Sequence, residues 1–457
     1  EKFVMGGKGV RALAYDAASK SVFVASAGPN TGPNPDHMGV QGTGGVGVID
    51  VKALTYPRHL GFNYGVLNAF AYDAKRGRLY GADIAEGLLH VVDARALVSP
   101  DEKKARGAHA SATALPPPEG FPTFRAREDF GPGGVVAAAV DVPPRVGNIP
   151  ERRAGVEIHT GPMGLALSSD GKSLLVLERF AGKVVLVDVN EKPKIVKSWS
   201  LFDPLVQADR RLGEIIYYAD FGRTGMSCDT CHFEGHSEGV FYTKTGMERI
   251  WRSPPVLGTR DTPPYFNPPA HATVEDMASY VGSNNRFQNL PLSDDEIFRL
   301  SGYVKTLTTP RNPHRKSDGG LLDDVDLGEG RHGKPLHGLA IFESRCAGCH
   351  PAPLFATDQD PKTRRRFMKM TTPQTLELRK DMQELSFTAR TPPSLVGAWD
   401  VWPMLLSASA GYADVGDHLE AVDRKPIRAV LERYSDLGPG DAMSLNPQAR
   451  ADLEAFV

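Results

Sequence analysis

Residues 73–93 read DAKRGRLYGADIAEGLLHVVD, and residues 16–50 and 169–188 follow the same plan. Each copy begins with a polar turn, continues with a short apolar run and a polar loop, and ends with a second run that closes on an aspartate. Short apolar runs bounded by Gly, Asp and Asn are typical of strands joined in hairpins. Repetition of such a unit predicts blades of a β-propeller. A β-sandwich whose hairpins agree by coincidence is the alternative.

The repeated unit predicts an all-β, propeller-like domain over residues 1–200. Three copies are few for a closed ring, so we expect either degenerate further blades or a chain that starts part-way into a ring. Residues 94–155 are rich in Ala, Pro and Gly, with Leu115-Pro116-Pro117-Pro118 among them. This composition predicts a long loop or an insertion between blades.

All the cysteines of the chain, four in number, lie in two strings, Cys228-Asp229-Thr230-Cys231-His232 and Cys346-Ala347-Gly348-Cys349-His350. Both strings are C-x-x-C-H, the attachment signature of a c-type haem. Two thiols three residues apart can form thioethers to one porphyrin, and the adjacent histidine then lies beneath the iron as its proximal ligand. The sequence therefore predicts two covalently bound haem c groups, with proximal ligands His232 and His350. A redox dithiol or a zinc site is the alternative, although no further cysteine completes a tetrahedral zinc site.

The bulk composition excludes several classes of protein. A formal net charge of -2 over 457 residues gives no basic excess for binding nucleic acid. No apolar run reaches transmembrane length. Because haem c is attached outside the bacterial cytoplasm, the two motifs predict a periplasmic or secreted protein. The chain begins at Glu1 without an apolar leader, which fits a processed chain and a truncated one equally.

From about residue 201 the spacing of apolar residues becomes helical. We expect helices over residues 211–218, 294–307, 336–342 and from 446 onward. Ser293 and Glu296 have the spacing of a capping box. The predicted domains are a first c-type haem domain over 201–312, a linker over 313–335 and a second c-type haem domain over 336–457. The expected fold is thus multidomain, with an N-terminal all-β propeller-like domain followed by two mainly α-helical cytochrome c-type haem domains.

A second pattern follows each haem motif. Residues 252–266 read RSPPVLGTRDTPPYF, and residues 390–403 read RTPPSLVGAWDVWP. An Arg–Pro–Pro–Leu–Gly stretch behind each of two C-x-x-C-H motifs resembles the bacterial dihaem cytochrome c peroxidase family, which includes the MauG-type oxidases. The resemblance covers residues 201–457. The N-terminal repeats lie outside it and resemble YVTN-type propeller repeats.

The resemblance implies a division of labour between the haems. The haem at His232 would react with hydrogen peroxide, and the haem at His350 would relay electrons to it. Trp251 takes the place of the family's tryptophan between the haems, although a tryptophan there can also be a packing residue. Glu275 aligns with the family's catalytic glutamate, which moves a proton between the peroxide oxygens. The family's Asp-Gly-Arg is replaced here by residues 267–271, NPPAH, so that His271 lies where a distal-pocket residue is expected.

The sixth iron ligands have several candidates. A thioether raises the potential of a haem, which makes Met404 and Met443 candidates at the second haem. Tyr412 is a third candidate there, and a lone methionine is more often a core residue. His236 and His271 are the candidates at the first haem. The alternative for His236 is a hydrogen bond to a haem propionate or to its own loop, and the alternative for His271 is an ordinary solvent-facing role. The family also binds calcium between its modules, and the carbonyl groups of Thr391 and Pro393 are candidate ligands.

The sequence favours hydrogen peroxide reduction, with a small cytochrome c or a cupredoxin as the electron donor. Two alternatives stay open. One is peroxide-dependent oxidation of a partner protein, as in MauG-type enzymes. The other is a non-catalytic dihaem electron-transfer subunit of a larger redox assembly.

Overall fold

The computed structural model describes residues 10–26, 43–53, 55–63, 67–84, 87–114, 124–125, 157–158, 161–202, 208–218, 227–237, 241–243, 250–263, 265, 271–283, 292–348, 350–356, 394–401, 412–414, 419–421, 426–433 and 444–457. The chain divides into two compact units. The first comprises residues 1–234 and 278–303, and the second comprises residues 235–277 and 304–457.

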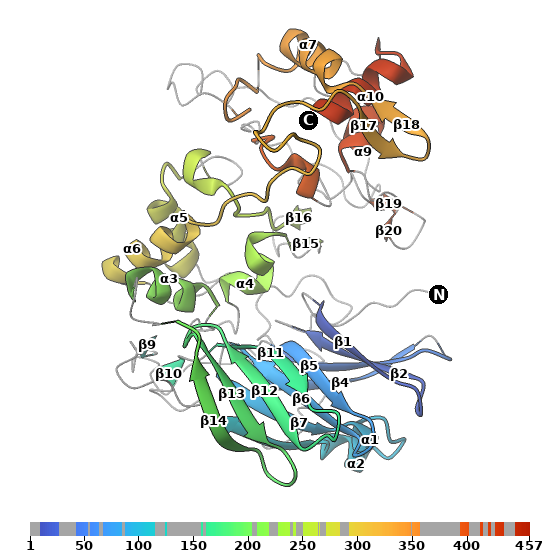
Figure 1. The fold of residues 1–457 in the computed structure, drawn as a ribbon, viewed down its shortest axis with the longest axis vertical. Helices are drawn as coiled ribbons and strands as arrows, with labels where there is room; N and C mark the ends of the chain where they lie inside the picture. The colour runs from blue at the N-terminus through green and yellow to red at the C-terminus, as the bar shows by residue number, and fades with distance from the viewer. Residues whose placement is uncertain are drawn as a thin grey trace. The chain divides into compact units, whose positions relative to one another are not determined.

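Three four-stranded antiparallel sheets belong to the first unit (Figure 1). The first sheet consists of β1 (Val10–Asp16), β2 (Ser21–Ser26), β3 (Thr43–Asp50) and β4 (Thr55–Asn63). The second consists of β5 (Leu67–Asp73), β6 (Arg78–Asp83), β7 (Leu88–Asp93) and β8 (His109–Ala114). The third consists of β11 (Pro162–Leu167), β12 (Ser173–Glu178), β13 (Lys183–Asp188) and β14 (Lys194–Ser200). Strands follow chain order within each sheet, so that each strand pairs with its neighbours in sequence.

The sheets pack face to face on apolar side chains. Because side chains alternate along a strand, each sheet presents two faces. The core between the first and second sheets includes Phe23, Val46, Leu60, Leu67 and Leu79, and the core between the second and third includes Tyr80, Leu89, Leu174, Val176 and Val187. All ten are 0% exposed. The middle sheet therefore packs on both of its faces.

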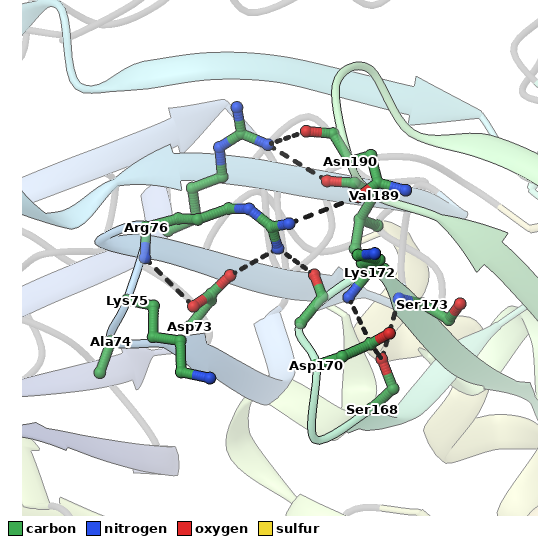
Figure 2. A network of polar contacts seen from close by, with 12 residues as sticks. Asp73, Ala74, Lys75, Arg76, Ser168, Asp170, Lys172, Ser173, Val189 and Asn190 are labelled. Carbon is green, nitrogen blue, oxygen red and sulfur yellow. Dashed lines mark hydrogen bonds and ion pairs between the residues drawn. The ribbon is translucent and has the colours of Figure 1, made fainter.

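Polar turns connect the second sheet to the third (Figure 2). The Arg76 Nη1 donates to Asp73 Oδ2 at 3.0 Å and to the carbonyl oxygen of Gly171, and Nη2 donates to Asn190 Oδ1 at 3.3 Å. Arg78 follows Arg76 in sequence and donates to backbone carbonyl groups of residues 189–191. Arg76 and Arg78, beside the first turn of the second sheet, thus form hydrogen bonds to two turns of the third sheet.

The remaining elements are helices and short strands. They are α1 (Ala94–Leu97), α2 (Glu102–Arg106), β9 (Phe124–Arg125), β10 (Glu157–Ile158), α3 (Ala208–Tyr218), α4 (Cys228–Cys231), η1 (Phe233–Gly235), β15 (Phe241–Thr243), β16 (Ile250–Arg252), η2 (Thr259–Asp261), α5 (Val274–Ser283), α6 (Asp294–Val304), β17 (Val325–Gly328), β18 (Arg331–Gly333), α7 (Pro335–Arg345), η4 (Ala398–Asp400), β19 (Tyr412–Asp414), β20 (Leu419–Ala421), α9 (Pro426–Arg433) and α10 (Pro447–Phe456).

The local helix signals are confirmed. At the start of α6, the backbone N–H of Ser293 donates to Glu296 Oε2 at 2.6 Å, and the N–H of Glu296 donates to Ser293 Oγ at 3.4 Å. This is the reciprocal capping box that the spacing predicts. Asn446 caps α10, where its Oδ1 accepts from the N–H of Ala449 at 2.9 Å.

The predicted fold class was wrong. The described residues contain three four-stranded sheets and no closed ring of blades, because the repeat occurs only three times and a closed ring needs at least about four blades. The two haem regions are not mainly helical either, since the hairpins β15–β16, β17–β18 and β19–β20 lie among the helices.

Two further segments differ from expectation. Residues 94–114, expected within a loop, contain α1, α2 and β8, so that expectation was wrong for this part. Residues 325–333, inside the expected linker, form the β17–β18 hairpin. Its two-residue turn places Glu329 and Gly330 at φ of 57° and 71°, as a type I′ turn requires.

Candidate functional site

The first C-x-x-C-H string forms a single helical turn. Ser227 caps the turn, because its side chain accepts from the backbone N–H of Thr230 at 3.2 Å. The N–H of His232 donates to the carbonyl oxygen of Cys228 at 2.9 Å and closes the turn. Residues at i and i+3 share one face of a helix, so Cys228 and Cys231 lie on the same side.

Burial dominates the environment of the first thiol of this turn. Cys228 and Cys231 are not joined by a disulfide. Burial, followed by the neighbouring Cys231 and Asp229, raises the pKa of Cys228 to about 12. Redox dithiols in C-x-x-C motifs depend on a lowered thiol pKa. The local environment therefore counts against the redox-dithiol alternative.

A buried ion pair holds the turn to the first sheet. Arg11, on β1, donates from Nη2 to the carbonyl oxygen of Asp229 at 2.6 Å and lies 2.9 Å from Asp229 Oδ2. The two side chains are 1% and 0% exposed. The guanidinium also lies 3.8 Å from the ring centroid of Phe233. Burial raises the pKa of Asp229 to about 6, and Arg11 opposes that rise.

A second arginine, which follows a strand of the third sheet, binds the residues just after the first motif. Arg179 follows β12 and donates to both carboxylate oxygens of Glu234 at 2.9 and 3.0 Å. Its Nε donates to Glu214 Oε1, on α3, at 2.7 Å. Glu234 has a left-handed backbone at φ 49°, and its N–H donates to Asp229 Oδ1 at 2.9 Å. Two arginines from two sheets thus fix both ends of the segment that contains His232.

Helix α3 reaches the first motif through Tyr217, whose hydroxyl donates to the carbonyl oxygen of His232. Burial raises the pKa of Tyr217 well above its ordinary value, so the hydroxyl keeps its proton. The ring packs on Tyr303 of α6 with centroids 5.4 Å apart. Gly213, one turn earlier, allows this close crossing, because a Cβ there would lie 2.7 Å from the carbonyl carbon of Arg299.

The second motif has a comparable backbone. The N–H of His350 donates to the carbonyl oxygen of Cys346 at 2.9 Å, as His232 does to Cys228. His350 Nδ1 lies 2.9 Å from the carbonyl oxygen of Phe355. Because a carbonyl can only accept, Nδ1 carries the proton in the neutral ring, and Nε2 carries the lone pair that binds a metal.

The helices around the second motif repeat the arrangement of the first. On α7, Gly338 precedes Phe342 by four residues, as Gly213 precedes Tyr217 on α3. Phe342 packs on Phe456 of α10 with centroids 5.1 Å apart. A Cβ at Gly338 would lie 2.6 Å from the carbonyl carbon of Asp452. Each motif is therefore preceded by a helix that crosses a later helix at a glycine and packs an aromatic ring against it.

The predicted catalytic glutamate lies near the start of α5. Glu275 forms an ion pair with Lys305, and the two side chains are 38% and 35% exposed. His271 pairs with Tyr265 through two backbone hydrogen bonds, of 2.8 and 3.3 Å. Burial raises the pKa of Tyr265 to about 12, and the charges of Asp261 and Glu275 add to the rise. Glu275, His271 and Tyr265 thus belong to one part of the second unit, whereas His232 belongs to the first unit.

The other candidates are only partly described. His236 Nδ1 lies 3.2 Å from Asp400 Oδ2. Trp251 lies on β16 opposite Tyr242 of β15. The side chains of Trp251 and Tyr412 lie outside the described residues, as do Cys349, Met404, Met443, Thr391 and Pro393. Their roles stay predictions.

Sequence reasoning missed the residues that hold the motifs. Arg11 and Arg179 come from the sheets, and nothing in their local sequence points to a partner near residue 230. The glycines carried a usable signal. Gly-x-x-x-aromatic occurs ahead of both motifs, at Gly213 and Gly338, and this shared spacing could have been found by aligning the two regions.

No family model matches the chain, and no curated protein matches it. Solved structures resemble it only weakly. The periplasmic gluconolactonase PpgL of Pseudomonas aeruginosa is 12% identical at a TM-score of 0.26, over 42% of each chain. Hydrazine synthase of Kuenenia stuttgartiensis is 13% identical at a TM-score of 0.23, over 43% of this chain and 37% of that chain. A xenon-pressurised structure of that synthase is 15% identical at a TM-score of 0.35, over 53% of this chain and 86% of that chain. The chain thus spans less than half the length of the first two structures.

Two searches of the described residues are negative. No helix there is long and apolar enough to cross a membrane. No group of three or more His, Cys, Asp and Glu side chains there is arranged to hold a metal ion.

Proposed function

We propose that the chain is an exported dihaem c-type oxidoreductase. The observation that supports this most strongly is a backbone hydrogen bond that recurs in the two C-x-x-C-H strings. In each, the histidine N–H donates to the carbonyl oxygen of the first cysteine at 2.9 Å. The residues fit the group, because Cys228 and Cys231 share a face of α4 and His350 presents Nε2 as its lone-pair nitrogen. Bound haem would supply reversible one-electron chemistry at each site.

We expect the purified protein to carry two haems per chain when it is made in a host that attaches haem c. Replacing Cys228 and Cys231 with alanine should lower the ratio to one, and replacing Cys346 and Cys349 should do the same. Intact mass and pyridine haemochrome absorbance measure the ratio. A wild-type chain without covalent haem, or with a Cys228–Cys231 disulfide, would contradict the proposal.

Hydrogen peroxide reduction is the reaction that we propose for the pair of sites. Electrons would enter at the His350 site and pass to the His232 site, near Trp251. Glu275 would move the proton that O–O cleavage requires. In the structure its carboxylate forms an ion pair with Lys305.

We expect Glu275→Gln to lower peroxide turnover by about 10²–10⁴-fold, because an amide cannot carry the proton. Haem content and the spectrum of the oxidised protein should not change. Asp276→Asn is the matched control, since Asp276 is the next residue on α5 and is exposed. Turnover is followed by stopped-flow peroxide consumption with a reduced small cytochrome c. Equal turnover in both variants would remove Glu275 from the reaction.

One observation favours the electron-transfer alternative. Glu275, the predicted catalytic glutamate, is held in an ion pair with Lys305, and His236, a candidate ligand of the first haem, lies 3.2 Å from Asp400 Oδ2. Each thus already has a partner within the protein. Spectra separate the two functions. An electron carrier should show two low-spin haems that ignore peroxide, even after one-electron reduction. A peroxidase should show a high-spin component that peroxide converts.

A further inference from the structure

The three sheets share one register, so their positions can be compared directly. Just before the first turn of each sheet, cross-strand pairs form between Tyr15 and Val22, Tyr72 and Leu79, and Leu167 and Leu174. One residue later on the second strand of each sheet lie Phe23, Tyr80 and Leu175. Equivalent residues therefore face equivalent neighbours.

One face of each sheet is built to pack on the preceding sheet. Tyr72 packs against the core between the first and second sheets, where its ring lies 5.5 Å from that of Phe23. Leu167 packs in the same way against the core between the second and third sheets. The equivalent residue of the first sheet, Tyr15, is 52% exposed, and Leu13 on the same face is 64% exposed.

The opposite face of each sheet is built to pack on the following sheet. Phe23 of the first sheet and Tyr80 of the second are both 0% exposed there. Their equivalent in the third sheet, Leu175, is 41% exposed, and Leu177 on the same face is 39% exposed. Trp199 of β14, also 41% exposed, joins this face through its pairing with Val184.

We propose that two copies of the chain associate head to tail, with the first sheet of each copy packed on the third sheet of the other. The proposal continues an interface that the chain already makes twice, between its first and second and between its second and third sheets. The contact between Phe23 and Tyr72 has its counterpart in Leu175 of one copy against Tyr15 of the other. Each copy carries both faces, so a closed two-copy assembly covers the exposed apolar side chains at both ends.

Paired substitutions test the proposed contact on the full chain. Size-exclusion chromatography with light scattering should give twice the chain mass at about 100 μM, where micromolar association is populated. Tyr15→Lys and Leu175→Glu should each weaken association at least tenfold, because each buries a lone charge in an apolar contact. The double variant Tyr15→Lys/Leu175→Glu should recover much of the loss, since it creates opposite charges across both contacts.

The outcomes are distinct. A monomeric wild-type chain at every concentration would overturn the proposal, and so would wild-type association in both single variants. Weak association in the double variant would also overturn it, because it would mean that like faces meet instead. Phe298→Lys, which changes a 65% exposed side chain on α6, is the control and should associate as the wild type does. Far-ultraviolet circular dichroism verifies that each variant folds.

Discussion

Arg11→Met should lower the free energy of unfolding by about 3–5 kcal/mol, because it leaves the Asp229 carboxylate buried without its cation. The two groups lie 2.9 Å apart and are 1% and 0% exposed. Urea denaturation followed by circular dichroism measures the loss. The double variant Arg11→Met/Asp229→Asn should lose less than the single one, since an amide can be buried without the cost of a charge.

The loss should depend on pH in a defined direction. Burial raises the pKa of Asp229 from 3.8 to about 6. A carboxyl group whose pKa is higher in the folded state contributes to stability while it is protonated. That contribution is fully present below the pKa of the unfolded state and is lost as the pH rises through the pKa of the folded state. Arg11 limits that loss in the wild type. The destabilisation caused by Arg11→Met should therefore be small near pH 4 and full above the pKa of Asp229.

The control for this prediction is an exposed ion pair. Arg260 and Asp261 are 61% and 45% exposed, and solvent screens their attraction. Arg260→Met should leave the urea midpoint unchanged at every pH. If Arg11→Met and Arg260→Met have equal effects, the buried pair does not hold the first motif.

Gly213→Ala should destabilise the first unit by about 1–3 kcal/mol or more, because the added methyl group has no space. It would lie 2.7 Å from the carbonyl carbon of Arg299 and 2.9 Å from Cβ of Tyr303. Helices α3 and α6 would have to separate, and Tyr217 would lose its contact with Tyr303. The measurement is again the free energy of unfolding in urea.

The same helix pair offers an internal control. Gly302 lies within α6, and a Cβ there would meet nothing within 4 Å. Gly302→Ala should raise stability by about 0.5–1 kcal/mol, because alanine favours the helix. If Gly213→Ala lowers the free energy of unfolding and Gly302→Ala raises it, the tight crossing at Gly213 is established. If both variants lose stability equally, glycine is needed at Gly213 and Gly302 for its backbone conformation and not because a methyl group has no room.

The sequence predicts the local structure well where neighbours in the chain determine it. Ser293 and Glu296 form the expected capping box, and each repeat forms hairpins in the expected places. These features depend on residues a few positions apart, so pattern and propensity are enough to find them.

The long-range features could not be predicted in the same way. Arg11 and Asp229 are separated by 218 positions, and nothing in the sequence around Arg11 points to a partner in the first motif. The repeats predicted propeller-like blades, too few for a closed ring by themselves, but repeats show only what each unit forms and not whether the units close. Glu329-Gly330 was read as part of a polar linker, although its turn joins two strands of three and four residues. Such short strands leave little periodicity to detect.

On the proposed function, the pair Arg11–Asp229 suggests an order of events during maturation. Residue 11 is synthesised long before residue 229, yet its guanidinium closes over a carboxylate that lies between Cys228 and Cys231. On the proposed function, porphyrin would reach both thiols most readily before Arg11 is bound to this turn. Covalent modification would then precede the final closure of the N-terminal strand. The ion pair would then form after the cofactor is attached and would fix the N-terminal strand to the first motif.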